Sequence, residues 1–299
     1  LIMDSRRWDG FRFRDDDIVI ATPSKCGTTW MQMMCALVLF QDPELPAPLT
    51  RLSPWLDVQT ESVDSVFAEL EAQTHRRFIK THTPFDGIPH DSRVTYIAVG
   101  RDPRDVALSW DNHFSNMKLD VIIGLRAEVA GLDDLAELMP DGIVEPSADP
   151  VVRFWEWMQV EDDIAGLAGL LNHLRTFWEH RDDSNVTLFH YADMKADLAA
   201  EMRRLAAALR VEVDESKWDE LVAAATFDRM RDRADQLAPQ VTHGFWNDPS
   251  QFFHHGSSGQ WRSFLDDDDV ARYEARVREL AAPDLAEWVH TGRRGVGTA

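Results

Sequence analysis

Residues 18–29 read Ile18-Val19-Ile20-Ala21-Thr22-Pro23-Ser24-Lys25-Cys26-Gly27-Thr28-Thr29, and an apolar stretch of helical length follows as far as Phe40. A β-branched run, a turn marked by Pro and Gly, and an apolar helix predict a strand-loop-helix unit. Such a loop aims backbone N–H groups and the positive end of a helix at an anion. Lys25 adds a positive charge, and Thr28 and Thr29 add hydroxyl donors. The segment therefore predicts a site for a nucleotide or another oxyanion.

This loop differs from the Walker A sequence G-x-x-x-x-G-K-[ST] of P-loop kinases and NTPases. Lys25 precedes Gly27 by two residues, and no glycine stands four residues further back, where the residue is Ala21. The loop is P-loop-like only in its general arrangement. For this segment alone, an ordinary strand-to-helix turn with a surface lysine remains the alternative.

Sequence patterns alternate between strand and helix along the chain. Strands are predicted at 17–22, 77–81, 93–99 and 185–191, and helices at 28–40, 63–73, 103–116, 151–167, 170–180, 194–209, 214–226 and 267–281. This alternation predicts an α/β fold, a single domain over 1–299 with a central, mostly parallel sheet flanked by helices. Its core would span about 17–265, with a C-terminal helix at 267–281. The stretches 42–57 and 121–150 predict irregular connections, either binding loops or plain surface insertions.

Composition narrows the range of partners. The 299 residues carry 31 basic and 52 acidic side chains, a net charge of −21, which argues against binding nucleic acid. No apolar run reaches the length of a membrane span and no signal peptide begins the sequence, so a cytoplasmic location is expected. Cys26 and Cys35 lie too far apart for a disulfide if the helix forms. No metal-binding motif is present, so a metal-independent site is expected.

Two further strand ends carry polar side chains toward the same edge of the predicted sheet. Arg101 ends one strand, and Asp102 and Pro103 begin the next helix as N-cap and first residue. An arginine there suits a phosphate, although a salt bridge to a neighbouring aspartate is the alternative. Another strand ends in Lys80-Thr81-His82. A lone histidine is usually structural, but an imidazole beside a lysine at a strand end suits general-base catalysis.

Together these segments resemble the cytosolic sulfotransferases, which use 3′-phosphoadenosine-5′-phosphosulfate (PAPS) as the sulfuryl donor. The resemblance rests on six segments in family order, from about residue 17 to 265. They are Lys25–Trp30, Lys80–His82, Arg101–Ser109, Leu188–Lys195, Thr226–Met230 and Phe253–Trp261. The resemblance implies a sulfotransferase that uses PAPS, releases adenosine 3′,5′-bisphosphate (PAP) and needs no metal.

The resemblance also assigns roles to single residues. His82 would be the general base, Lys80 an electrostatic helper, and Lys25 the contact to the bridging and sulfuryl oxygens. The remaining assignments concern the nucleotide: the loop Cys26, Gly27, Thr28 and Thr29 for the 5′-phosphate; Trp30 and Tyr191 for adenine; Arg101 and Ser109 for the 3′-phosphate; Thr226, Phe227 and Met230 for the pocket wall; and His254, His255 and Gly256 for the late closing loop. For Trp30, Tyr191 and the 226–230 segment, plain core packing is the alternative.

Three departures from the family pattern carry expectations of their own. His254-His255 replace the family's Arg-Lys, which predicts nucleotide binding that strengthens as the pH falls toward 6. Cys26 replaces a common serine, either as an inert residue or as a thiol of lowered pKa. The family's dimerisation pattern is not evident at 262–269, so the oligomeric state stays open.

The acceptor is expected opposite the nucleotide, near His82. Aromatic residues that could form its walls are Trp55, Phe85, Phe114, Trp155, Trp157, Phe245 and Trp246, with core packing as the alternative for each. They would suit a small-molecule hydroxyl acceptor such as a phenol, an alcohol or a glycolipid, or an amine. Two other functions remain: a P-loop kinase or NTPase, disfavoured by the missing Gly-Lys-Ser/Thr, and a non-catalytic nucleotide-binding module, disfavoured by Lys25 and His82 together.

Overall fold

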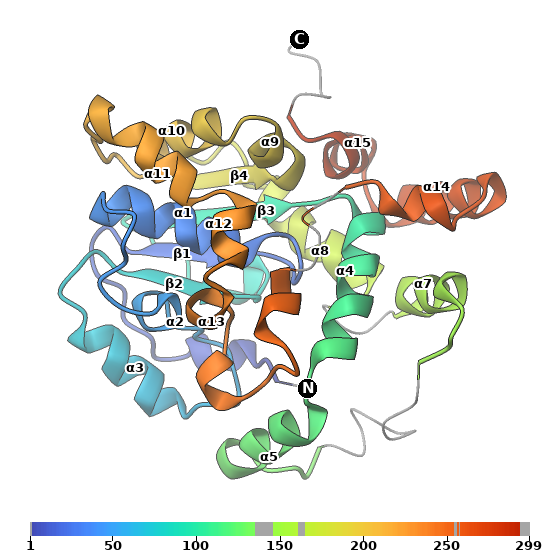
Figure 1. The fold of residues 1–299 in the computed structure, drawn as a ribbon, viewed down its shortest axis with the longest axis horizontal. Coiled ribbons are helices and arrows are strands. Elements are labelled where there is room, and N and C mark those ends of the chain that lie inside the picture. Colours follow the sequence, from blue (N-terminus) through green and yellow to red (C-terminus); the bar gives the residue numbers. More distant parts are fainter. Residues whose placement is uncertain (1, 135–145, 161–164, 254–255, 257, 294–299) are drawn as a thin grey trace.

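A four-stranded parallel sheet lies at the centre of the computed structural model, which describes residues 2–134, 146–160, 165–253, 256 and 258–293 (Figure 1). Its strands are β1 (Ile18–Ala21), β2 (Phe78–Thr81), β3 (Thr95–Gly100) and β4 (Val186–His190), in the order β2-β1-β3-β4. Ile18 pairs with Phe78 on one side and with Thr95 on the other, and Tyr96 pairs with Val186. The four predicted strands are confirmed with shifted ends, and the sheet among the described residues is parallel throughout.

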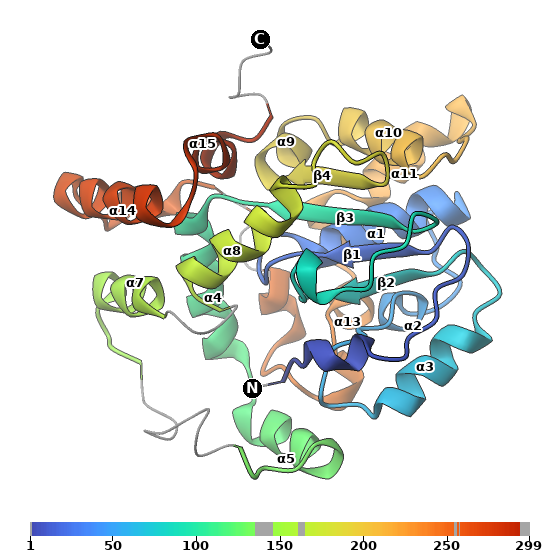
Figure 2. The ribbon, with the colours of Figure 1, turned by 180° about the vertical axis from the view of Figure 1, so that it is seen from behind.

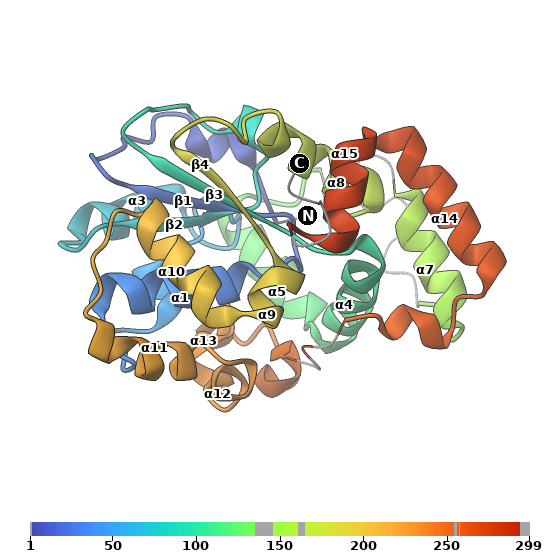
Figure 3. The same cartoon turned by 90° about the horizontal axis from the view of Figure 1, so that it is seen from above.

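Both faces of the sheet are covered, which is why its strands are apolar without alternation. One face packs on α1 (Thr28–Phe40), α10 (Leu198–Ala208) and α11 (Trp218–Ala224), seen together below the sheet in Figure 3. The other face meets α8 (Leu167–Trp178), which crosses the sheet in Figure 2, and the 3-10 helix η1 (Ser5–Trp8). Ile18 and Ile20 face the first layer, whereas Val19 and Ala21 face the second.

A further group of helices lies beyond the carboxyl ends of the strands. It contains α4 (Pro103–Asn116), α7 (Pro150–Gln159), α14 (Asp267–Leu280) and α15 (Pro283–Thr291), on the right of Figure 3. The other elements are α2 (Leu49–Leu52), α3 (Val63–Ala72), α5 (Leu119–Val129), α9 (Tyr191–Ala196), α12 (Phe227–Arg231), α13 (Ala234–Leu237), η2 (Phe85–Gly87), η3 (Glu215–Lys217), η4 (Val241–His243), η5 (Pro249–Phe253) and η6 (Gln260–Ser263). None of the described helices is long and apolar enough to cross a lipid bilayer.

The helix predictions are right for α1, which begins after the left-handed Gly27, and for α4, which begins at the Asp102 cap, and they are wrong where a cap lies inside a predicted helix. α1 and α4 have the predicted bounds, and Asp102 caps α4 by accepting a hydrogen bond from the amide of Arg104. The predicted helix at 194–209 is instead two helices, because Asp197 is extended (φ −154°) and caps α10. The predicted helix at 151–167 ends at Gln159, and residues 161–164 lie outside the described part.

The two stretches expected to be irregular are partly helical. Residues 42–57 contain the single turn α2, and residues 121–150 begin inside α5. Residues 135–145 of the second stretch lie outside the described residues. The sequence does not predict α5 as a full helix because Gly124, and the Gly and Pro residues that follow the helix, are helix-breaking signals.

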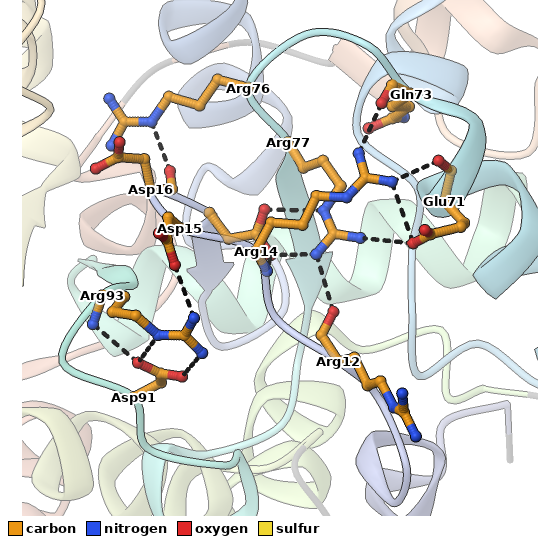
Figure 4. Close-up of polar contacts among 11 residues, drawn as sticks. Arg12, Arg14, Asp15, Asp16, Glu71, Gln73, Arg76, Arg77, Asp91 and Arg93 are labelled. Carbon is orange, nitrogen blue, oxygen red and sulfur yellow. Dashed lines mark hydrogen bonds and ion pairs between the residues drawn. The ribbon is translucent and has the colours of Figure 1, made fainter.

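Buried charge holds the amino ends of β1 and β2 together, at the edge of the sheet opposite Lys25. Asp17 and Arg77 are both almost fully buried, and the Arg77 Nε lies 2.8 Å from the Asp17 Oδ1. The Asp17 Oδ2 also accepts from the amide of Arg14 at 2.8 Å. Figure 4 shows Arg14 and Arg77 in this network, with Glu71 beside them. A buried ion pair that lost one partner would leave an unpaired charge, so the pair fixes where both strands start.

The cap of α14 gives a test of local stability. Asp266 accepts from the amide of Asp269 at 2.8 Å, and Asp269 accepts in return from the amide of Asp266, forming a capping box. Asp266→Ala should lower the free energy of unfolding by about 1 kcal/mol in a denaturant titration. Asp266→Asn should preserve most of that stability, because asparagine caps as well as aspartate. Equal losses in both variants would contradict the cap.

Candidate active site

The ends of all four strands deliver side chains to one cavity of about 270 Å³. Lys25 follows β1, Lys80 and His82 lie at the end of β2, Arg101 follows β3, and Tyr191 follows β4. The cavity is lined by thirteen of the predicted site residues, namely Lys25, Gly27, Thr28, Thr29, Trp30, Lys80, His82, Arg101, Ser109, Tyr191, Phe227, Met230 and Gly256. Parallel strands place their carboxyl ends at one edge, which explains why distant segments converge here.

The loop between β1 and α1 has the geometry of an anion site. Lys25 and Gly27 have left-handed backbones, with φ of 67° and 105°. A Cβ on Gly27 would also lie 3.2 Å from the Tyr191 ring, so both the backbone and the space favour glycine. The amides of Gly27, Thr28 and Thr29 have no acceptor among the described residues. These free N–H groups at the start of α1 fit a phosphate or sulfate oxygen.

Lys25 and Arg101 are held side by side at this loop. The Arg101 Nη1 donates to the Lys25 carbonyl at 3.0 Å, and its guanidinium lies 4.3 Å from the Tyr191 ring centre. The Lys25 Nζ lies 2.8 Å from the His113 Nδ1 and 4.7 Å from the Phe252 ring centre. Burial, and then the positive charge of Arg101, lower the pKa of Lys25 to about 7. The alternative of a salt bridge from Arg101 to Asp102 or Asp105 does not occur among the described residues.

Lys80 is a second buried cation in the cavity. Its side chain is 4% exposed, and its Nζ lies 3.6 Å from the centre of the Trp55 ring. Burial lowers the pKa of Lys80 to about 7. Within the described part of the chain, none of Lys25, Lys80 and Arg101 pairs with a carboxylate. Three unpaired positive groups in one cavity fit a ligand that carries several negative charges.

The geometry of His82 fixes its tautomer. Its Nδ1 lies 2.8 Å from the carbonyl oxygen of Thr22, which only accepts, so Nδ1 carries the proton. The Nε2 then bears a lone pair, and no described residue forms a hydrogen bond with it. Burial, and then the charge of Lys80, hold the pKa of His82 well below its usual value. The ring is therefore neutral near pH 7 and can accept a proton.

Asp57 anchors the strand end that carries His82. Its Oδ2 accepts from the Thr81 Oγ1 at 2.8 Å, from the His82 amide at 3.0 Å and from the Thr83 Oγ1 at 2.9 Å. Asp57 is 1% exposed, and burial raises its pKa. This carboxylate fixes the backbone of His82 without contacting the cavity.

Sequence reasoning missed Asp57, His113 and Phe252. Asp57 is brought to His82 by packing across 25 residues, for which no local pattern exists. His113 was detectable, because it lies one helical turn after Ser109 on α4 and so faces the same side. Phe252 immediately precedes the late segment that was identified, and its ring covers Lys25.

Described residues of the late segment, Phe253–Trp261, form part of the cavity wall. Phe253, Gly256 and Gln260 line it, and the amide of Gly259 donates to the Asp105 Oδ1 at 2.8 Å. A Cβ on Gly256, whose φ is 57°, would lie 2.7 Å from the Phe227 ring, so this close approach requires glycine. His254 and His255 lie outside the described residues.

Two predicted nucleotide contacts do not line the cavity. Cys26 is fully buried against the cluster that contains Val106, and burial raises its pKa to about 12. The alternative of a thiol with a lowered pKa is therefore wrong, because loss of hydration outweighs the nearby cations. Thr226 turns away, and its Oγ1 donates to the Ala223 carbonyl at 2.8 Å. Cys26 and Cys35 are both free, as predicted.

The predicted acceptor walls divide into two groups. Trp55, Phe114, Phe245 and Trp246 line the cavity, together with the unpredicted Trp110, Leu108 and Ile122. Phe85, Trp155 and Trp157 do not. Phe85 stacks on His90 under the sheet, and the Trp155 Nε1 donates to the Asp269 Oδ1 at 2.8 Å. Trp157 packs in the outer helical cluster. These three predictions were wrong because an aromatic residue is as often part of the core.

Known proteins match this chain over most of its length. The model of the sulfotransferase domain family matches residues 15–284. A glycolipid sulfotransferase of Mycobacterium bovis BCG is 42% identical over 311 aligned positions, covering 100% of this chain and 95% of the relative. An amine sulfotransferase of Oryctolagus cuniculus is 27% identical, covering 91% of this chain and 82% of the relative.

Solved structures show the same fold. Retinol dehydratase in complex with androsterone and the inactive cofactor PAP has a TM-score of 0.71 at 19% identity, with 94% of this chain and 87% of that chain covered. Mouse sulfotransferase SULT7A1 complexed with PAP has a TM-score of 0.69 at 18% identity, with 94% and 90% covered. The α/β fold predicted from the sequence is thus confirmed.

Proposed function

Because this chain belongs to the sulfotransferase domain family, we propose that it moves the sulfuryl group of PAPS to a hydroxyl of a small-molecule acceptor. The observation that carries the proposal is that Lys25, Lys80 and Arg101, which have no carboxylate partner among the described residues, line one cavity with His82, whose Nδ1 is taken up by the Thr22 carbonyl. Two similar structures are complexes with PAP, which supports this donor. In this proposal residues 1–299 act as one domain, and the free thiols fit a cytoplasmic location.

In the proposed reaction, His82 acts on the acceptor, and Lys25 and the loop amides act on the donor. The acceptor oxygen attacks the sulfur while its proton passes to the His82 Nε2, forming the new O–S bond. The bond between sulfur and the 5′-phosphate oxygen breaks in line with the attack, and that oxygen leaves with the electron pair. Lys25 and the free amides of the loop stabilise the charge on it. The products are a sulfate ester and PAP.

On the acceptor side, the walls are mostly apolar and aromatic. Trp110, Phe245 and Trp246 line the same cavity as His82, and Phe114, in the last turn of α4, lines it and is half exposed. Such walls bind an alkyl or aromatic portion, while the reacting hydroxyl needs only His82 and Lys80. The 42% identical relative is named a glycolipid sulfotransferase, which supports a glycolipid acceptor ahead of a simple phenol or amine.

Melting with ligands separates this function from a kinase or NTPase. PAP at 100 times its dissociation constant should stabilise the chain by about 2.7 kcal/mol without Mg²⁺. ATP with Mg²⁺ should shift the melting temperature much less, because the loop lacks the Walker A lysine and Mg²⁺ ligand. The measurement is a thermal shift titration with EDTA present in the PAP series. Stabilisation by ATP-Mg²⁺ alone would refute the proposal.

PAP binding should depend on pH through the two buried lysines. Lys25 and Lys80 have a pKa of about 7 in the free protein, and a bound polyanion favours their charged forms. Binding therefore takes up protons above pH 7, and the dissociation constant should rise by up to about tenfold per lysine per pH unit between pH 7 and 9. Calorimetry in buffers of different ionisation enthalpy measures this uptake directly.

His254 and His255 predict a second change in the dissociation constant of PAP, at lower pH, in the same experiment. If they contact the 3′-phosphate, binding should strengthen again as the pH falls toward 6. The double variant His254→Gln, His255→Gln should abolish only the change in the dissociation constant near pH 6 and keep the change above pH 7. A dissociation constant that does not vary between pH 6 and 9 would contradict both parts.

A further inference from the structure

A second cavity, of about 320 Å³, adjoins the one that holds His82. The two share Trp55, Lys80, Pro239 and Gln240 as common wall residues. Its other walls come from Gln32 of α1, from α2 and the residues after it, from residues 61–69 before and along α3, and from 237–243. Its size falls in the range of small-ligand sites. Nothing in the transfer chemistry described above uses this space.

The lining of the second cavity is chemically unlike that of the first. Its neutral polar side chains are those of Gln32, Thr50, Ser53, Ser62, Ser65, Gln240 and Thr242. Its two carboxylates are those of Glu61 and Glu69. Leu49, Leu237 and the two prolines are its apolar members. Closely spaced hydroxyls, amides and carboxylates, both donors and acceptors, are the groups that satisfy a polyhydroxylated ligand.

Two polar atoms at this cavity lack partners. The Ser53 Oγ is buried, with the residue 1% exposed, and it has no hydrogen bond among the described residues. The same holds for the Nε1 of the neighbouring Trp55 on the shared wall. A buried polar group without a partner costs free energy, so these atoms indicate a ligand that would satisfy them.

Charge around the second cavity argues for a neutral occupant. The Gln240 Nε2 donates to the Glu61 Oε1 at 2.9 Å, and the Arg51 Nε lies 2.7 Å from the Glu69 Oε1. Glu61 and Glu69 are matched in number by Arg51 and Lys80, so the lining offers no excess charge of either sign to an ionic ligand. A sugar, which is neutral and offers vicinal hydroxyls as donors and acceptors, suits such a lining.

We propose that the second cavity binds the sugar headgroup of a glycolipid acceptor, while the lipid portion lies along the aromatic walls of the first. The inference rests on the proposed function and names its substrate class. Lys80 connects the two spaces: it lies on the shared wall near the end of β2, and both it and His82, two residues later, line the first cavity. A sugar hydroxyl that passes Lys80 is thereby presented to the His82 Nε2.

The test compares octyl glucoside with 1-octanol, which differ only in the sugar. Ser65, an exposed residue of α3, lines the second cavity and not the first, so Ser65→Trp adds bulk to the wall of the second cavity alone. We expect the KM for octyl glucoside to rise about tenfold, with kcat and the values for octanol within about twofold. Ser184→Trp, at an exposed turn elsewhere, is the matched control. The pair Ser53→Ala, Glu61→Gln repeats the test without added bulk.

Calorimetry on the PAP-loaded protein separates this inference from the proposed function. Tighter binding of octyl glucoside than of octanol, lost in Ser65→Trp, supports the sugar site even if neither compound is sulfated. In that case the proposed function fails and the site stands. Equal affinity for the two compounds, or a preference unchanged by Ser65→Trp, overturns the inference even if both are sulfated.

Discussion

Replacing His82 by asparagine should lower turnover by about 10²–10⁴-fold and leave the dissociation constant of PAP within about twofold. Asparagine keeps a donor that can reach the Thr22 carbonyl, where the His82 Nδ1 lies at 2.8 Å, but it has no counterpart of Nε2. The variant therefore removes the proton acceptor without disturbing the contact that orients the side chain. His82→Ala should lose as much turnover, because the acceptor is missing there too.

The pH profile of the parent protein strengthens this test. The neutral form of His82 is required, so the rate falls as the pH drops through its pKa. Because burial and Lys80 lower that pKa, the acid limb of kcat/KM should lie below pH 6.5. When the donor's negative charge offsets Lys80 and Lys25, the pKa should rise and the base should become stronger.

Three controls make the result decisive. His180→Gln changes a histidine that pairs with Asp183 at the surface and should keep full activity. The residual rate of His82→Asn should show no acid limb. Melting curves with PAP show whether the variant still folds and binds. Activity within about tenfold of the parent would mean that another group takes the proton.

The sequence was sufficient for the sheet because the signals for its strands are local. Each strand is a short run that contains β-branched residues, and Asp102 with Pro103 begins α4. The rule that ligands bind at the carboxyl ends of parallel strands then predicts that Lys25, His82 and Arg101 lie together. The error at 194–209 was also local, since Asp197 is a good cap that was read as part of a helix.

What the sequence could not provide is the packing of side chains against one another. The contact between Lys25 and His113 joins residues 88 positions apart, and the second cavity is lined by five separate stretches, at 32, 49–55, 61–69, 80 and 237–243. No pattern of periodicity or spacing encodes such contacts. Aromatic residues illustrate the same limit. Trp246 lines the cavity, whereas Trp155 donates a hydrogen bond to Asp269 of α14 outside it, and each of these tryptophans directly follows a phenylalanine in the sequence.

The second large effect is expected at Lys25. Lys25→Met keeps the length and apolar stem of the side chain and removes its charge, so kcat should fall by about 10²–10³-fold. The reason is that the lysine charge stabilises the phosphate oxygen as it leaves. In the variant only the loop amides remain to stabilise that oxygen. PAP, which already carries that oxygen, should also bind more weakly, but by a smaller factor than kcat loses.

The pattern of losses at Lys25 distinguishes stabilisation of the leaving oxygen from simple attraction of the nucleotide. Lys80→Met removes a charge of similar pKa in the same cavity, but Lys80 lies over Trp55 on the acceptor side and not at the loop. It should therefore affect kcat less than Lys25→Met does. Lys195→Met, at an exposed position on α9, should change neither quantity. If Lys25→Met weakened PAP binding and left kcat intact, the lysine would only attract the donor. The leaving oxygen would then depend on the amides of Gly27, Thr28 and Thr29, which have no other acceptor in the described part of the chain.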